Sequence, residues 1–248
     1  MTKSEIIRFI ILRSIGNFLL LFSIFGIVAS FGPTLFYEAQ FQIAKLRGVH
    51  YSVADEILKQ VQDDKGEQAS SPFGEILKQQ RQQNQETGFR SILIGPKEQV
   101  LTPKDPLFSI LIPKVGANEK VFPNVDPNNE KEFLPILYQG VAHAKGSVFP
   151  GMPGNIYLFA HSSDNFWDVG RYNAIFYLLK DVMPGDDIVL FFENRRHNYV
   201  VTGSQIVEAS DVSYLIKGQN QAKENLILQT CWPPGTTWKR LLVFAKPK

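Results

Sequence analysis

The chain has 248 residues, with 26 Lys or Arg against 24 Asp or Glu, so its formal net charge at neutral pH is only +2. This balance gives no electrostatic reason to expect nucleic acid as a partner. The chain has one cysteine, which excludes an intramolecular disulfide, so a folded domain must rely on its hydrophobic core.

An uncharged apolar run at Ser14–Tyr37 is the first predicted element. It is long enough to cross a bilayer, which takes about 20 residues. Among the residues before it, Lys3, Arg8 and Arg13 are basic and only Glu5 is acidic. The positive-inside rule therefore predicts a cytoplasmic N-terminus over 1–13, a single-pass cell-membrane helix over 14–37 in contact with lipid, and an extracellular remainder. A cleavable signal peptide is the alternative, although its apolar region usually has only about 7–15 residues.

Residues 38–104 are polar and differ in composition from the residues that follow. They are rich in Gln, Lys, Asp and Glu, most clearly at Gln79–Glu86. Spaced apolar residues over Ala39–Val61 predict a helix that continues from the membrane, and Gly66–Pro72 predicts a break. We interpret 38–104 as a stalk or linker that sets the height of a domain over 105–248, with a binding function as the alternative.

Short apolar runs separated by turn signals begin at Asp105. This regular spacing predicts a mainly β fold, either a closed barrel or a sandwich. Asn173–Asp181 predicts one helix, which ends before Pro184. The sequence has no Gly-rich phosphate loop and no Cys/His cluster with zinc-ligand spacing, so neither a cofactor nor a metal is expected. The strand candidates are Phe108–Ile112, Lys120–Phe122, Asn155–Ala160, Ile188–Phe192, Tyr199–Val207, Leu226–Thr230 and Leu241–Ala245.

The segment Leu226–Phe244 contains the most informative pattern in the chain. Its two apolar runs are separated by a loop, Trp232–Lys239, that includes two prolines and a glycine. If the runs pair as antiparallel strands, Cys231 and Arg240 face each other at the mouth of the loop. A nearby cation favours the thiolate, which is the nucleophilic form of cysteine. The pair thus indicates nucleophilic chemistry, with a buried structural cysteine as the alternative.

A thiol nucleophile also needs a proton carrier, which is usually a histidine. His161 follows the apolar run Asn155–Ala160, and a side chain at a strand end can project into a cleft. His143 lies upstream of the same strand, in a predicted loop, and periodicity alone does not choose between the two. His197 is predicted at a solvated hairpin tip, and His50 is expected to be exposed.

Taken together, these segments resemble the sortases, which are membrane-anchored cysteine transpeptidases of the bacterial cell surface. The similarity runs from about Asp105 to Phe244 and is closest to the D- and E-like classes. Those classes usually have Gly before the catalytic histidine and Arg after it, where this chain has Ala160 and Ser162, which leaves the subclass open. The similar segments are ILIPKVGANEKVFPNV at Ile110–Val125, GVAHAKGSVFPGMPGNIYLFAH at Gly140–His161, FYLLKDVMPGDDIVLFF at Phe176–Phe192, and the Thr230, Cys231 and Arg240 pattern.

The resemblance implies a closed sortase-type β-barrel of about eight strands with short helices over 105–248. It implies that Cys231 forms a thioester with a C-terminal LPxTG-like sorting signal, that His161 transfers protons, and that Arg240 stabilises the oxyanion. The protein would then be transferred to an amine, either in the cell envelope or on a pilin lysine. No cofactor is implied.

Four further residues are predicted to border this site. His143 orients the substrate or His161, or has a structural role in its loop. Thr230 shapes the site, and Trp232 and Trp238 either line a groove for the peptide or anchor the loop to the barrel. A papain-like enzyme is disfavoured because every histidine precedes the cysteine. The alternative function is a non-catalytic, membrane-anchored β-barrel that binds envelope ligands.

Overall fold

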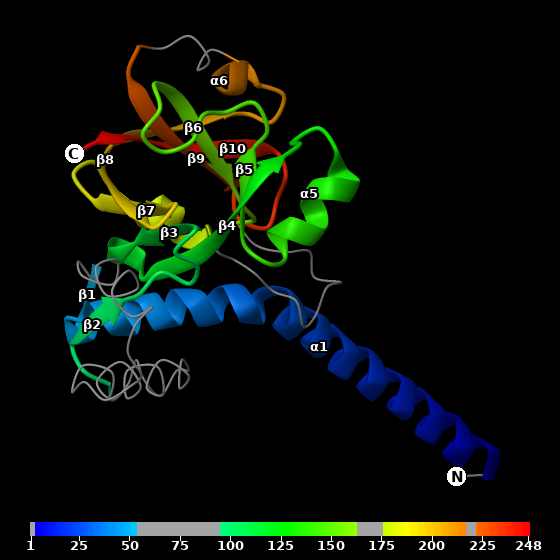
Figure 1. Ribbon diagram of the computed structural model, residues 1–248. Helices are drawn as coiled ribbons and strands as arrows, with labels where there is room; N and C mark the ends of the chain where they lie inside the picture. The colour runs from blue at the N-terminus through cyan, green and yellow to red at the C-terminus, as the bar shows by residue number, and fades with distance from the viewer. Residues whose placement is uncertain (1–2, 54–94, 163–175, 217–221) are drawn as a thin grey trace, which may run out of the picture.

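A long N-terminal helix and a β-barrel make up most of the computed structural model, which describes residues 3–53, 95–162, 176–216 and 222–248 (Figure 1). In chain order the elements are α1 (Lys3–Arg47), β1 (His50–Val53), β2 (Glu98–Leu101), β3 (Phe108–Ile112), the 3-10 helix η1 (Pro113–Val115), β4 (Ala117–Val125), α5 (Glu130–Leu137), β5 (Val141–Ala144), β6 (Gly154–Phe159), the 3-10 helix η2 (Tyr177–Asp181), β7 (Asp187–Phe192), β8 (Arg195–Glu208), α6 (Ser213–Ile216), β9 (Glu224–Trp232) and β10 (Lys239–Pro247).

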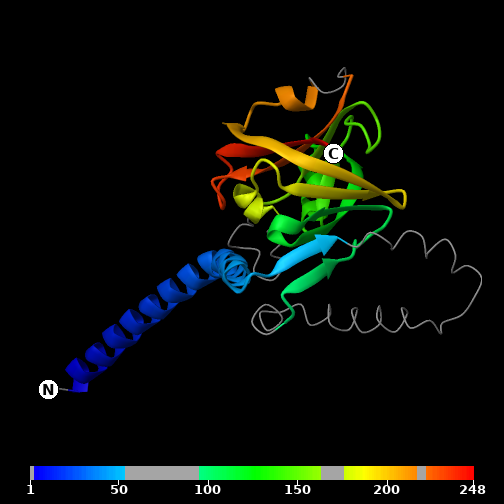
Figure 2. The same cartoon turned by 90° about the vertical axis from the view of Figure 1, so that its left-hand side faces the viewer.

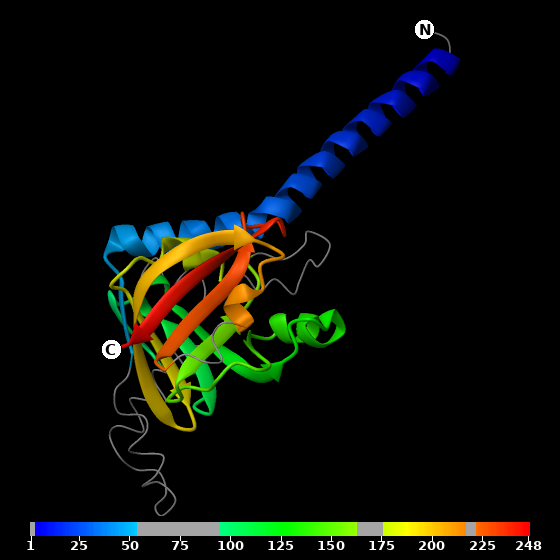
Figure 3. The same ribbon diagram turned by 90° about the horizontal axis from the view of Figure 1, so that it is seen from above.

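Eight of the described strands form a closed barrel in the order β10-β8-β7-β3-β4-β5-β6-β9, with β9 beside β10 (Figure 3). This confirms the prediction of a mainly β closed barrel. Neighbouring strands run antiparallel except at β4–β5 and β6–β9, which are parallel. Closure leaves no free edge in the barrel. Each of the seven strand candidates coincides with a strand, although Ala160 lies one residue beyond the end of β6. The sequence analysis missed β1, β2 and β5. In β5 the four residues, VAHA, carry no run of β-branched or aromatic side chains.

Side chains of β6, β9 and β10 alternate between two faces of the barrel wall. One set meets residues from β3, β7 and β8 in the barrel interior and defines the inner face: Ile156, Leu158, Leu226, Leu228, Leu241 and Val243. The other set, the outer face, packs with Phe133, Ile136 and Leu137 of α5: Tyr157, Phe159, Ile227 and Leu242. Burial on both faces explains why these strands read as continuous apolar runs in the sequence.

The N-terminal part of α1 extends away from the barrel, and its C-terminal part runs beside the barrel (Figures 1 and 2). The helix contains the predicted span of 14–37, and Lys3–Val28 is an apolar stretch long enough to cross a membrane. The helix predicted over Ala39–Val61 ends earlier. Gly48 adopts a left-handed φ of 65°, and the amides of Gly48 and Val49 bond the carbonyls of Lys45 and Ala44. This is the Schellman arrangement that terminates helices.

A small parallel sheet of β1 and β2 lies against the outside of the barrel (Figure 2). Val53 of β1 and Leu101 of β2 pack on three buried residues of β3 and β7, namely Leu111, Val189 and Phe191. Both described ends of the segment 38–104 therefore contact the barrel, and the interpretation of the whole segment as a stalk or linker stays a prediction. The predicted break at Gly66–Pro72 lies outside the described residues.

The helix predicted over Asn173–Asp181 is present as the single 3-10 turn η2 in its described part. Phe176, Tyr177 and Leu179 are buried, which explains the apolar pattern that suggested a helix. The turn ends before Pro184, as expected.

Candidate active site

Cys231 and Arg240 are direct cross-strand partners in the antiparallel pair β9–β10. This confirms the predicted pairing. Cross-strand partners project from the same face of a sheet, and their neighbours Thr230 and Leu241 are buried towards the interior. The thiol and the guanidinium therefore share the outer face, beside the loop that joins the strands.

His161 lies two residues beyond the end of β6, which runs parallel to β9 with Phe159 opposite Gln229. Two further bonds continue this register: the Ala160 amide donates to the Gln229 carbonyl at 3.2 Å, and the Thr230 Oγ1 donates to the Ala160 carbonyl at 3.1 Å. Two residues beyond Phe159 and Gln229, His161 reaches the level of Cys231. Strand alternation gives it the same outer face as Tyr157 and Phe159.

The three residues predicted to be catalytic thus meet at one end of three neighbouring strands, β6, β9 and β10. Tyr138, at the C-terminus of α5, places its ring centroid 5.7 Å from that of His161. Arg240 Nη1 donates to the carbonyls of Thr237 and Lys239, both at 3.1 Å. These two bonds hold the guanidinium at the mouth of the loop.

The protonation of Cys231 differs from the sequence prediction. The thiol is half-buried. Burial raises the pKa of Cys231 above its ordinary value, and the opposing effect of the Arg240 guanidinium is smaller. Arg240 alone therefore does not keep Cys231 as a thiolate in this structure. For the thiol to act as a nucleophile, a base must first remove its proton.

Two polar residues on the outer face were missed by the sequence analysis. The Tyr157 hydroxyl donates to Gln229 Oε1 at 2.5 Å. Burial raises the pKa of Tyr157, against a smaller lowering by Arg240, so the hydroxyl stays protonated. The signal that could have identified Gln229 is its position two residues before Cys231, since strand periodicity gives it the same face.

The residues that flank the cysteine have different surroundings. Thr230 is buried and its hydroxyl bonds the Ala160 carbonyl, while its role in shaping the site stays a prediction. Trp232 packs against the interior core, which favours the anchoring role for this side chain. Trp238 is 73% exposed. Contact of Trp238 with a peptide stays a prediction.

His143 is fully buried in strand β5, not in a loop as predicted. His143 lies two residues after Val141 on β5, so its side chain points to the same face of the strand. Val141 faces the barrel interior, and the ring of His143 therefore lies on the opposite side of the barrel wall from Cys231. Its Nδ1 accepts from the Asn124 amide at 3.2 Å, which leaves the proton on Nε2, 3.1 Å from the Val148 carbonyl. The ring also stacks on Phe149 at 4.5 Å. These contacts favour the structural role for His143.

Replacing His143 with alanine is expected to lower the free energy of unfolding by about 2–4 kcal/mol, because it leaves a cavity and two unpaired backbone groups. Burial lowers the pKa of His143, so the folded state favours the neutral ring. Its contribution is complete above the ordinary pKa of about 6.5 and is lost as the pH falls below it. Denaturant unfolding at pH 7 and pH 5 measures both effects. A fully stable variant with reduced turnover would contradict the structural role.

The remaining histidines are distant from this chemistry. His197 lies within β8, opposite Leu190, and not at the hairpin tip, which consists of Glu193 and Asn194. It borders a cavity of about 530 Å³ near the end of the barrel where β6 begins, with Phe149 among its walls. Burial lowers the pKa of His197. His50 is exposed on β1, as expected.

Comparison with known proteins identifies the family. The Sortase domain model matches residues 110–248, which is more than half of the chain. Sortase D of Bacillus subtilis (strain 168) is 29% identical over 138 residues, which cover 54% of this chain and 60% of that protein. Among solved structures, sortase C1 of the group B Streptococcus pilus island 1 has a TM-score of 0.48 at 22% identity and covers 57% of this chain and 63% of its own. The sortase D5 transpeptidase of Clostridium perfringens has a TM-score of 0.47 at 19% identity, covering 69% and 88% respectively. The chain belongs to the sortase family.

Proposed function

We propose that this protein is a membrane-anchored cysteine transpeptidase that cleaves a C-terminal LPxTG-like sorting signal and transfers the cleaved protein to an amine. The observation that carries the proposal is the meeting of Cys231, His161 and Arg240 at one end of three neighbouring strands in a chain of the sortase family. The acceptor is an amine of the cell envelope or the side chain of a pilin lysine.

In the proposed mechanism, His161 takes the proton of Cys231, and the resulting thiolate attacks the carbonyl carbon of the scissile peptide bond. Arg240 donates hydrogen bonds to the oxyanion of the tetrahedral intermediate. The imidazolium of His161 then gives its proton to the leaving amine, the C–N bond breaks, and a thioester remains on Cys231. The acceptor amine then attacks the thioester carbonyl and gives a proton to His161. The C–S bond breaks, the new amide is released, and the imidazolium returns the proton to the Cys231 thiolate.

The proposal is tested with a fluorescent LPxTG-type peptide and the full-length protein in detergent. Cleavage should release the fragment after the threonine, and an added amine should appear on the new C-terminus. Hydroxylamine should capture the thioester as a hydroxamate. Absence of cleavage and of hydroxamate across a panel of sorting peptides would reject the proposal.

A thiol-reactivity measurement separates the proposed enzyme from the alternative named in the sequence analysis, a membrane-anchored barrel that binds envelope ligands without catalysis. The two functions differ in the behaviour of the thiol. In the enzyme, His161 accelerates alkylation of Cys231 by iodoacetamide at neutral pH, so the His161→Ala variant should react more slowly. In the binding module, wild type and variant react equally slowly.

Arg240→Lys is expected to reduce kcat/KM about 100-fold, because lysine keeps the charge but loses the planar set of donors. Peptide cleavage by the two proteins at equal concentration measures the effect. Lys239→Arg is the matched control, since Lys239 is exposed and neighbours Arg240 on the same strand. Full activity of Arg240→Lys would remove Arg240 from the proposed oxyanion site.

The proposed topology has the N-terminus in the cytoplasm, α1 in the cell membrane and the barrel outside. Its support is the apolar stretch Lys3–Val28 together with the basic residues near its start. Protease added to intact protoplasts should digest the barrel completely. Protection of the barrel in intact protoplasts, with digestion only after lysis, would reverse the topology.

A further inference from the structure

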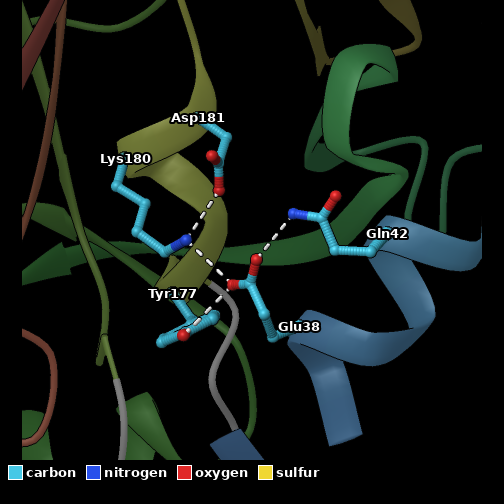
Figure 4. A network of polar contacts seen from close by, with 5 residues as sticks. All are labelled: Glu38, Gln42, Tyr177, Lys180 and Asp181. Atoms are coloured by element: carbon cyan, nitrogen blue, oxygen red, sulfur yellow. Dashed lines mark hydrogen bonds and ion pairs between the residues drawn. The ribbon is translucent and has the colours of Figure 1, made fainter. Parts of the chain in front are cut away.

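A polar cluster joins α1 to the barrel immediately beyond the predicted membrane span (Figure 4). Glu38 of α1 accepts hydrogen bonds from Lys180 Nζ at 2.9 Å and from the Tyr177 hydroxyl at 3.2 Å, both on η2. Gln42, one turn further along α1, donates to the other Glu38 oxygen at 2.8 Å. Lys180 also pairs with Asp181 at 2.9 Å. The contact links segments 142 residues apart in the sequence.

Lys180 is less exposed than the lysines of the other ion pairs in the described part of the barrel, which are 44% to 59% exposed. The side chains of Lys180 and Glu38 are 23% and 29% exposed. The Lys180 ammonium lies 5.0 Å from the centroid of the Tyr177 ring. The hydrogen bond from Gln42, followed by that from Lys180, lowers the pKa of Glu38, so the residue is a carboxylate at neutral pH.

The other end of η2 reaches the backbone of the proposed proton carrier. The amide of Phe176, the residue before η2, donates to the His161 carbonyl at 3.2 Å. Phe176 and Leu179 are buried in the interior core, so η2 is fixed on its inner side by packing. On its outer side, Glu38 contacts Tyr177 and Lys180. A continuous set of contacts therefore runs from α1 through η2 to His161.

We propose that Glu38 is a positioning residue for His161: the carboxylate on the anchor helix holds η2, and η2 holds the backbone of the proton carrier. This inference rests on the proposed function. The anchor helix is then a structural part of the active site as well as a tether. The packing of Val53 and Leu101 on the barrel supports this, because it fixes the chain beyond α1 at a second point.

The test uses the full-length protein in detergent micelles with Glu38→Ala, Lys180→Met and the exchanged pair Glu38→Lys with Lys180→Glu. The matched control is Lys120→Met. Lys120 also pairs with a carboxylate, that of Asp105 at 2.8 Å, and also lies over an aromatic ring, that of Phe122 at 5.3 Å. Neither of its partners belongs to η2.

We expect Glu38→Ala and Lys180→Met to lower kcat for a sorting peptide about fivefold with KM unchanged, as for loss of one partly buried ion pair. The exchanged pair should recover most of the loss, and Lys120→Met should retain wild-type kcat. In protein with carbon-13-labelled histidine, the ring signal of His161 should move in the two single variants, while the signal of buried His143 stays in place.

Three results would overturn the inference: wild-type kcat in both single variants, an unmoved His161 signal, or an equal loss in Lys120→Met. If the wild-type protein cleaves no sorting peptide, the proposed function fails, and the histidine signals then decide on the positioning role alone. A moved His161 signal would support that role even without turnover.

Discussion

Cys231→Ala is expected to lower cleavage of a sorting-signal peptide to background, a loss of about 10⁵-fold or more. Without the thiol, the peptide acyl group has no sulfur with which to form the thioester. Hydroxamate formation should disappear with it, since no thioester is made. Single-turnover kinetics with the fluorescent peptide measure both. The thiol is half-buried and the substitution is small, so the folded barrel should persist.

Peptide binding separates chemistry from folding in this variant. Cys231→Ala should bind the uncleaved peptide with an affinity close to the wild-type KM, because the groups that hold the peptide remain. Cys231→Ser is the matched control, with an oxygen nucleophile of similar size and far lower reactivity. Cleavage by Cys231→Ala at the wild-type rate would exclude the cysteine mechanism.

His161→Ala is expected to reduce kcat about 10³-fold, within the range for loss of a general acid and base. Without it, the thiol, whose pKa is raised by burial, keeps its proton at neutral pH. Added imidazole should restore part of the activity by entering the vacated space. Rate measurements over a range of imidazole concentrations check this.

His197→Ala is the matched control for His161→Ala, since both remove one imidazole. His197 borders the cavity at the far end of the barrel, so its removal should change kcat less than twofold. An inactive His197→Ala beside an active His161→Ala would leave the cysteine mechanism intact but assign the proton transfer to the other histidine.

The β9–β10 half of the site could be predicted because its determinants are local. Pro233, Pro234 and Gly235 force a turn, and a short turn fixes the register of the strands on either side. Cys231 and Arg240 are therefore paired by the sequence between them. The β6–β9 register is non-local, and the place of His161 followed only from its position at the end of an apolar run.

The sequence-based predictions differ from the structure at residues whose surroundings depend on contacts with distant parts of the chain. His143 reads as a loop residue because β5 is only four residues long, and its burial depends on the aromatic rings of Phe108 and Phe149. Glu38 reads as a solvated residue because its partner Lys180 has no sequence signal that points to α1. The raised pKa of Cys231 depends on how far the folded chain buries the thiol, which the spacing of residues in the sequence does not indicate.

The parallel pairing of β6 with β9 also determines at which stage of folding the proposed site can assemble. Ala160 and Thr230, whose contact aligns the two strands, are 70 residues apart, and closure of so long a loop is slow. β10, which carries Arg240, is the final strand of the barrel in chain order. While the chain is being synthesised, the strands made before β9 and β10 have edges whose backbone groups are unpaired. Such edges are prone to aggregation and are bound by chaperones. Cys231, His161 and Arg240 come together only after β10 has docked, so a chain that lacks β10 also lacks the complete proposed site.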